Sequence, residues 1–184
     1  MGQELHEINW KLLYQTVDYF TGLNFKYIEV PWLVPSEISK ITFKNTDTIS
    51  GLSTLKYGDL IGSSEQSFIY LSLYKNLPLG RYIAVSPCFR EDEIDRLHQR
   101  HFMKAELFIT DDTSFSSLYN VIDMCSRNFS TMLGEVVELV ETEDGYDIVH
   151  NGIELGSYGV RTHNDLTWIY ATALAEPRFS DLNK

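Results

Sequence analysis

Two short apolar segments enclose the most highly charged stretch of the chain. Residues 82–89 and 102–110 are rich in aromatic and β-branched side chains, and each has the length of a β-strand. The eleven residues between them, 91–101, contain four acids, two arginines and two histidines. So many charges are incompatible with burial. We therefore expect a strand, a solvated loop and a second strand.

The rest of the sequence predicts a mixed fold. Apolar spacing predicts helices over residues 4–20, 64–74 and 114–132, and strands over 25–30, 136–141 and 146–153. Pro31 ends the first of these strands because proline supplies no N–H group to a ladder. The tail after Asn164 is compatible with a strand and a short helix. Regular β-α-β alternation is absent, so we expect an α+β domain with a largely antiparallel sheet flanked by helices, spanning residues 1–184.

An acidic composition limits the partners that we expect. Fifteen Lys and Arg against 26 Asp and Glu give a net charge of −11, which disfavours a dedicated nucleic-acid binder. No apolar run approaches the roughly 20 residues of a membrane span, and the amino terminus does not resemble a signal peptide. Cys88 and Cys125 fit neither a metal motif nor a disulfide framework. We expect a cytoplasmic protein with two reduced thiols and no membrane partner.

The residues at the two ends of the charged loop are candidates for binding a phosphate and a purine. Arg90 follows the first strand, and Phe102 opens the second. A guanidinium at a strand end can hold a phosphate with two hydrogen bonds, and a neighbouring aromatic ring can stack on a purine. The alternative is an ordinary solvated hairpin loop.

Two acids form a second candidate group. Asp147 and Glu154 flank an Asn151-Gly152 turn signal, so that a hairpin would bring both carboxylates toward one site. Paired oxygen ligands suit Mg²⁺ bound to a nucleotide. The alternative is two acids on an ordinary exposed hairpin. The sequence has no glycine-rich phosphate loop, so a nucleotide would have to be bound by side chains.

Together these segments resemble the catalytic core of class II aminoacyl-tRNA synthetases. The family's second motif is an F-R-x-[ED] strand end, a charged loop and a strand that begins with Phe, and residues 86–108 are similar to it. The resemblance implies that Arg90 contacts the α-phosphate of ATP and the amino-acid carboxylate. It also implies that Asp92 orients the adenine end, His98 reaches the outer phosphates and Phe102 stacks on adenine.

Residues 147–164 are most similar to the aspartyl, asparaginyl and lysyl subgroup. That likeness implies that Asp147 and Glu154 bind Mg²⁺–ATP and that Arg161 meets the substrate side chain, which favours aspartate or asparagine. It further implies substrate contacts for Gly156, in the same segment, and for Gln66, in a segment that resembles the subgroup's S-P-Q.

Two further likenesses concern the dimer and the third motif. Pro31 resembles the proline of the first motif, which implies a homodimer through this region. Residues 171–178 resemble G-x-G-L-x-x-x-R, which implies that Arg178 grips the γ-phosphate. Ala171 and Ala173 replace two glycines of that motif. No segment resembles an anticodon-binding domain, so we expect a minimal paralog.

The resemblance implies an ATP-dependent ligase that forms an aminoacyl-adenylate, with ATP and Mg²⁺ as cofactors and Arg90 and Glu154 as catalytic residues. The acceptor would be transfer RNA, a carrier protein or ammonia, and the net charge disfavours transfer RNA. The alternative is an inactive paralog that serves as a regulatory or accessory subunit. A third possibility is a domain that binds ATP without an amino acid.

Overall fold

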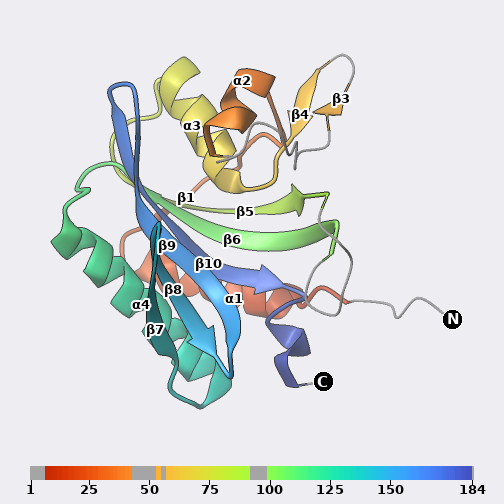
Figure 1. Cartoon of the computed structure of the whole chain (residues 1–184), viewed down its shortest axis with the longest axis vertical. Helices are drawn as coiled ribbons and strands as arrows, with labels where there is room; N and C mark the ends of the chain where they lie inside the picture. Colours follow the sequence, from red (N-terminus) through yellow and green to blue (C-terminus); the bar gives the residue numbers. More distant parts are fainter. Residues whose placement is uncertain (1–6, 43–52, 55–56, 92–98, 184) are drawn as a thin grey trace, which may run out of the picture.

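The structure, a computed structural model, describes residues 7–42, 53–54, 57–91 and 99–183 and is built around a seven-stranded sheet (Figure 1). The strand order is β1-β5-β6-β10-β9-β8-β7. The strands are β1 (Lys26–Tyr27), β5 (Arg81–Phe89), β6 (His101–Ile109), β7 (Glu138–Thr142), β8 (Gly145–His150), β9 (Ile153–His163) and β10 (Leu166–Glu176). Five neighbouring pairs are antiparallel, and β1 runs parallel to β5. The expected α+β fold with a largely antiparallel sheet is confirmed.

The predicted strand–loop–strand unit forms the centre of this sheet. β5 and β6 pair along their whole length, from Arg81 opposite Ile109 to Phe89 opposite His101. The predicted strand over residues 25–30 is shorter than expected, because β1 contributes only Lys26–Tyr27 to the ladder. The Asn151-Gly152 turn joins β8 to β9 with positive φ at both residues, the geometry that this dipeptide favours.

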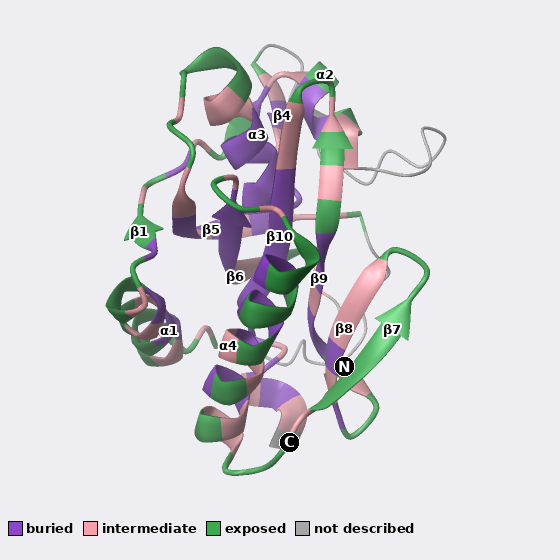
Figure 2. Ribbon diagram, turned by 90° about the vertical axis from the view of Figure 1, so that its left-hand side faces the viewer, coloured by how far each residue is buried: buried purple, intermediate pink, exposed green. Residues whose placement is uncertain are grey.

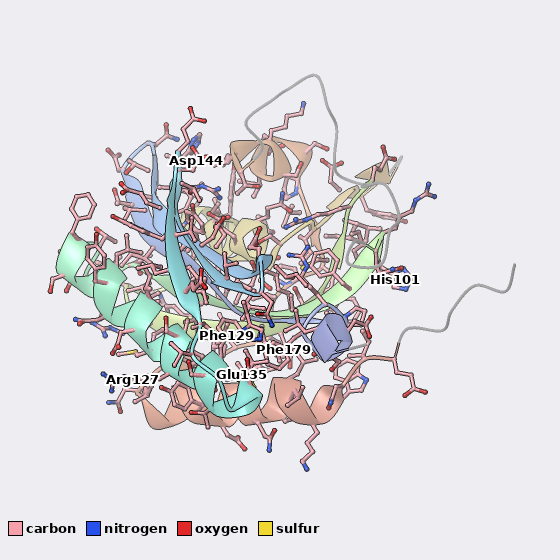
Figure 3. All side chains as sticks on the ribbon, turned by 60° about the horizontal axis from the view of Figure 1, so that its bottom comes forward. His101, Arg127, Phe129, Glu135, Asp144 and Phe179 are labelled. Carbon is pink, nitrogen blue, oxygen red and sulfur yellow. The ribbon has the colours of Figure 1, made fainter. Side chains whose placement is uncertain are left out.

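Two long helices cover one face of the sheet. α1 (Trp10–Gly22) and α4 (Phe115–Leu133) pack their apolar sides against it (Figures 1 and 2). α4 begins at Ser114, whose side chain accepts a hydrogen bond from the Ser117 N–H, and ends at Gly134 in the left-handed conformation. Phe129 of α4 stacks on Phe179 in the carboxyl-terminal segment, with ring centres 5.8 Å apart (Figure 3).

The opposite face carries smaller elements and a second core. These elements are α2 (Ser36–Ser39), the 3₁₀ turn η1 (Lys40–Thr42), α3 (Ser64–Tyr74) and a three-stranded sheet of β2 (Leu33–Val34), β3 (Ser53–Thr54) and β4 (Gly58–Leu60). Phe108 of β6 lies between Phe68 of α3 and Trp168 of β10, with ring centres 4.9 and 6.0 Å away. This stack attaches α3 to the middle of the main sheet.

The described residues end in the short 3₁₀ turn η2 (Ser180–Asn183), and with β10 it forms the expected strand and short helix after Asn164. Within the described residues, no helix is long and apolar enough to span a membrane.

Candidate active site

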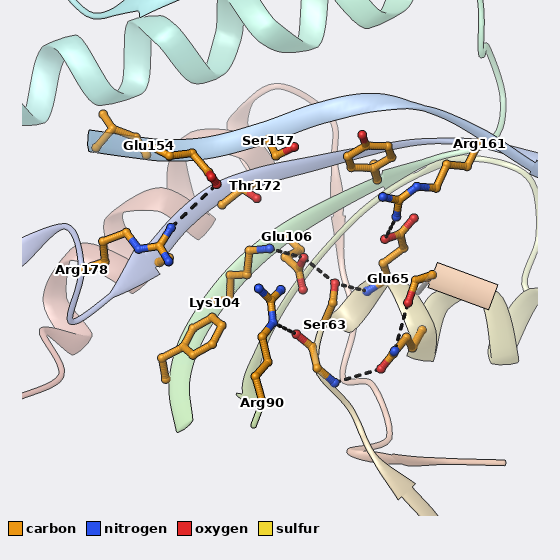
Figure 4. Close-up of a pocket in the computed structure, with 17 residues that line it drawn as sticks. Ser63, Glu65, Arg90, Lys104, Glu106, Glu154, Ser157, Arg161, Thr172 and Arg178 are labelled. Carbon is orange, nitrogen blue, oxygen red and sulfur yellow. Dashed lines mark hydrogen bonds and ion pairs between the residues drawn. The ribbon is translucent and has the colours of Figure 1, made fainter. Parts of the chain in front are cut away.

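A polar pocket lies on the sheet face that carries α3 (Figure 4). Successive side chains of a strand point to opposite faces, and alternate residues of β6, β9 and β10 therefore contribute to it. The pocket has a volume of about 390 Å³. Its described lining consists of Thr42, Gly62, Ser63, Glu65, Gln66, Arg90, Phe102, Lys104, Glu106, Glu154, Leu155, Ser157, Arg161, Tyr170, Thr172, Ala175 and Arg178.

Arg90 and Phe102, which the sequence placed at the two ends of the charged loop, meet in this pocket. The guanidinium carbon of Arg90 lies 5.3 Å from the centre of the Phe102 ring, and its Nε donates to the Gly62 carbonyl at 3.1 Å. Across the described part of the chain, Arg90 has no carboxylate partner. Asp92 and His98, the other two expected nucleotide contacts, lie outside the described residues.

Lys104 and Glu106 form a buried ion pair next to them. Lys104 Nζ lies 2.8 Å from Glu106 Oε1, and the Ser63 hydroxyl donates to the same oxygen at 2.7 Å. The backbone N–H of Ser64 donates to the other oxygen. Burial raises the pKa of Glu106, but Lys104 and the hydrogen bonds outweigh burial, so that the pKa lies below its ordinary value.

A second ion pair, between the buried Glu65 and the partly buried Arg161, occupies the other end of the pocket (Figure 4). Arg161 Nη1 lies 2.6 Å from Glu65 Oε2, and the Trp168 indole N–H donates to Glu65 Oε1 at 2.7 Å. Burial and the neighbouring Glu106 keep the pKa of Glu65 above its ordinary value, although Arg161 and Trp168 partly oppose this rise. Both carboxylate oxygens nevertheless accept N–H donors, the arrangement of an ionised carboxylate.

Neither acid was singled out by the sequence. Glu65 lies in the first turn of α3, where an acid is a common partner of the helix dipole. Glu106 stands inside the apolar strand β6, and a charge in such a segment was the available signal of a buried polar site.

Glu154 and Arg178, expected at the phosphates of ATP, face each other in the pocket with Nη1 and Oε1 3.7 Å apart. Asp147 lies near Glu154 but outside the described lining. Burial, followed by repulsion from Glu154, raises the pKa of Asp147. Two carboxylates that repel each other are the kind of arrangement that a divalent cation relieves, so these residues fit Mg²⁺. No group of three or more His, Cys, Asp or Glu that could hold a metal occurs among the described residues.

The two remaining expected contacts have structural partners. Gln66 is buried, and its amide binds the Gly62 N–H, the Ser39 carbonyl and the Thr42 hydroxyl at 2.9–3.0 Å. Gly156 is not among the described lining residues. A Cβ there would lie 2.6 Å from the Tyr158 hydroxyl, so glycine allows close strand packing at this position. Gln66 lines the pocket, and substrate contacts for Gln66 and Gly156 stay predictions.

The two alanines of the third motif lie away from the pocket. Ala171 and Ala173 belong to the core beneath α1 and α4, whereas Thr172 and Ala175 line the pocket. Within this stretch, the pairing of β10 with β6 shifts its register between Thr172 and Leu174. The methyl groups of Ala171 and Ala173 therefore do not enter the site.

The fold agrees with a class II synthetase core, and comparison with known proteins shows the family. The family model described as "tRNA synthetases class II core domain (F)" matches residues 11–169. The chain therefore belongs to the class II tRNA synthetase core domain family. Comparison with the curated proteins found no match.

Solved structures share the fold at low sequence identity. The pyrrolysyl-tRNA synthetase from Desulfitobacterium hafniense superposes with a TM-score of 0.77 at 13% identity, over 95% of this chain and 68% of that chain. A cytoplasmic serine-tRNA ligase from Naegleria fowleri, solved in complex with AMP, superposes with a TM-score of 0.75 at 19% identity, over 94% of this chain and 47% of that chain.

Proposed function

We propose that this chain activates an amino acid with ATP and forms an aminoacyl-adenylate. The observation that carries the proposal is the position of Arg90 against the Phe102 ring, inside a pocket that also holds Glu154 and Arg178. A guanidinium beside an aromatic ring can bind a phosphate and a purine at once. The AMP in the serine-tRNA ligase structure supports an adenine nucleotide as the ligand of this fold.

The reaction requires no nucleophile from the protein. A carboxylate oxygen of the amino acid attacks the α-phosphorus of ATP in line, a P–O bond forms, and the P–O bond to pyrophosphate breaks. Arg90 neutralises charge that develops on the α-phosphoryl oxygens, Phe102 holds the adenine, and Arg178 holds the outer phosphates. Mg²⁺ held by Asp147 and Glu154 would supply further positive charge at the phosphates. Positioning of the two substrates contributes much of the remaining rate enhancement.

The amino acid, the acceptor and the partners are part of the same proposal. Asp147, Glu154 and Arg161 support a relation to the aspartyl, asparaginyl and lysyl subgroup. Transfer RNA, a carrier protein and ammonia are the candidate acceptors, and the net charge of −11 weighs against transfer RNA. We place the reaction in the cytoplasm.

We also propose a homodimer through the Pro31 region. The Pro31 carbonyl accepts a hydrogen bond from the Ser67 hydroxyl at 2.6 Å, which holds this segment against α3. Beside it, Trp32 and Leu33 are 53% and 38% exposed. Large apolar side chains exposed together are typical of an interface.

One observation favours the accessory-subunit alternative. Three cations of the pocket already face carboxylates of the same chain: Lys104 faces Glu106, Arg161 faces Glu65, and Arg178 faces Glu154. A pocket that neutralises its own charges has less affinity for a triphosphate than one with free cations. The replacement of glycines by Ala171 and Ala173 no longer supports this alternative, because both methyl groups lie on the other face.

Amino-acid-dependent exchange between pyrophosphate and ATP, run with each of the twenty amino acids, tests the proposal. We expect exchange with at least one amino acid, and a loss of about 10²–10³-fold in Arg90→Ala, as for removal of a transition-state donor. Arg127→Ala is the matched control, because Arg127 is exposed on α4 and pairs with Asp123 on the same helix. Exchange with none of the amino acids would contradict adenylate formation. Calorimetry with ATP then separates a nucleotide-binding domain from an accessory subunit without nucleotide.

A further inference from the structure

The end of the pocket beneath α3 is built from a carboxylate and a guanidinium that neutralise each other. Glu65 is 7% exposed and bonds Arg161 at 2.6 Å. The guanidinium carbon of Arg161 also lies 4.1 Å from the centre of the Tyr170 ring. Trp168 holds the second oxygen of Glu65. The pair is therefore fixed from three sides, by α3, β9 and β10.

A fixed pair of opposite charges discriminates against charged ligands of either sign. An acidic side chain that approached Arg161 would also approach Glu65, and a basic side chain that approached Glu65 would also approach Arg161. Glu65 is buried and Arg161 is partly buried, so an added charge of either sign would remain largely uncompensated there, and such a charge is costly. An uncharged side chain meets neither penalty.

Among the described lining residues, the other cations are already assigned or paired, because Arg90 is proposed to bind the α-phosphate and Arg178 faces Glu154. Lys104 is already paired with Glu106 at 2.8 Å. Elsewhere in the described lining, Ser157, Thr42 and Thr172 contribute hydroxyl groups, and Thr172 and Ser157 lie toward Glu154 in Figure 4. Hydroxyl groups both donate and accept hydrogen bonds, so they suit a polar side chain without charge.

We infer that the amino acid bound at this site has an uncharged polar side chain, and that the Glu65–Arg161 pair rejects acidic and basic side chains. This inference rests on the proposed function. It revises the expectation drawn from Arg161 alone: asparagine remains compatible with the pocket, whereas aspartate does not. Glu65 is then a residue that determines specificity.

Binding of inert aminoacyl-adenylate mimics tests the inference without requiring turnover. Aminoacyl-sulfamoyl adenosines that carry seryl, threonyl, asparaginyl, aspartyl, lysyl and leucyl groups are titrated into the full chain by calorimetry. We expect one of the first three to bind at least about 100-fold more tightly than the aspartyl and lysyl mimics, a difference within the range for an uncompensated charge.

Glu65→Gln keeps the size of the side chain and removes its charge. Because Arg161 then lacks a counter-charge, we expect the affinity for the aspartyl mimic to rise about tenfold or more relative to the affinity for the asparaginyl mimic. Arg161→Gln leaves the negative charge of Glu65 without a partner, so the affinity for the lysyl mimic should rise instead. Glu141→Gln on the exposed strand β7 is the matched control and should change neither ratio. Thermal denaturation checks that each variant is folded, and the wild-type ratios remain decisive if one variant does not fold.

The outcomes separate this inference from the proposed function. If the aspartyl, lysyl or leucyl mimic binds the wild-type chain as tightly as the uncharged polar mimics, the inference is wrong and adenylate formation stands. If no mimic binds at all, the proposed function fails, and the inference fails with it.

Discussion

The guanidinium of Arg90 lies over the ring of Phe102, 5.3 Å from its centre, although a charged loop separates the two residues in the chain. The strand register explains this contact, because Cys88 pairs with Phe102 and Phe89 with His101 at the ends of β5 and β6. The paired strands therefore bring a cation and an aromatic ring to the same edge of the pocket.

Phe102→Ala should weaken AMP binding by about 5–150-fold, which corresponds to about 1–3 kcal/mol for the loss of one base–aromatic stack. Pyrophosphate binding should change little, because pyrophosphate has no base. Phe102→Tyr keeps the aromatic face and is the matched control. Calorimetry with AMP and with pyrophosphate measures both effects, and an AMP affinity unchanged in Phe102→Ala would show that adenine does not stack on this ring.

Asp147→Asn should stabilise the folded chain in the absence of divalent cations. Burial and repulsion by Glu154 raise the pKa of Asp147, so the folded state binds this proton more tightly than the unfolded chain does. Its contribution to stability is therefore fully present at low pH and is lost as the pH rises through the raised pKa. At pH 7 we expect a gain of at most about 1 kcal/mol, or a Tm higher by up to about 2–4 °C.

Asp147→Asn should also lose the stabilisation that Mg²⁺–ATP gives to the wild-type chain, because one of the two carboxylates of the proposed metal site is gone. Thermal denaturation between pH 4 and 8, with and without Mg²⁺–ATP, measures both effects. Asp165→Asn, in the exposed turn between β9 and β10, is the control. A wild-type level of Mg²⁺-dependent stabilisation in Asp147→Asn would remove Asp147 from the proposed metal site.

Gly156→Ala should destabilise the fold by about 1–3 kcal/mol, the usual cost of overpacking a buried position. The new methyl group would lie 2.6 Å from the Tyr158 hydroxyl and 2.9 Å from the Thr172 carbonyl, and would disrupt the 2.8 Å hydrogen bond that joins them. Thermal denaturation should show a Tm lower by about 2–12 °C. Gly22→Ala is the control, since a Cβ there meets nothing within 4 Å. Equal Tm values for the two variants would contradict this account of the packing between β9 and β10.

Trp32→Glu should dissociate the proposed homodimer, because it places a charge in the exposed apolar surface beside Pro31. We expect the wild-type chain to sediment as a dimer at micromolar concentration, and the variant as a monomer. Leu79→Glu changes an equally apolar residue, 73% exposed, in the segment between α3 and β5 and should leave the dimer intact. A monomeric wild-type chain would refute the dimer.

Local sequence patterns determined most of the secondary structure. The predicted helix over residues 64–74 coincides with α3, and the strands β5 and β6 begin within one residue of their expected starts. The Asn151-Gly152 turn was predictable because few other dipeptides adopt positive φ so readily. The meeting of Arg90 with Phe102 and the proximity of Asp147 to Glu154 also followed, because each pair lies on strands joined by one turn or loop.

Contacts between distant segments could not be read in this way. Glu65 and Arg161 are 96 positions apart, and only the packing of α3 against β9 and β10 brings their charges together. The sequence therefore presented Arg161 as a free cation, whereas the tertiary structure neutralises it. The direction in which Ala171 and Ala173 point was likewise decided by the register of β10 against β6.

By itself, then, the sequence determined the strands, the turn and the residues that carry charge, because these depend on neighbours along the chain. Only the tertiary structure decided which charges cancel, since Coulomb attraction depends on distance in space and on burial, and neither is fixed before the sheet and α3 have packed together.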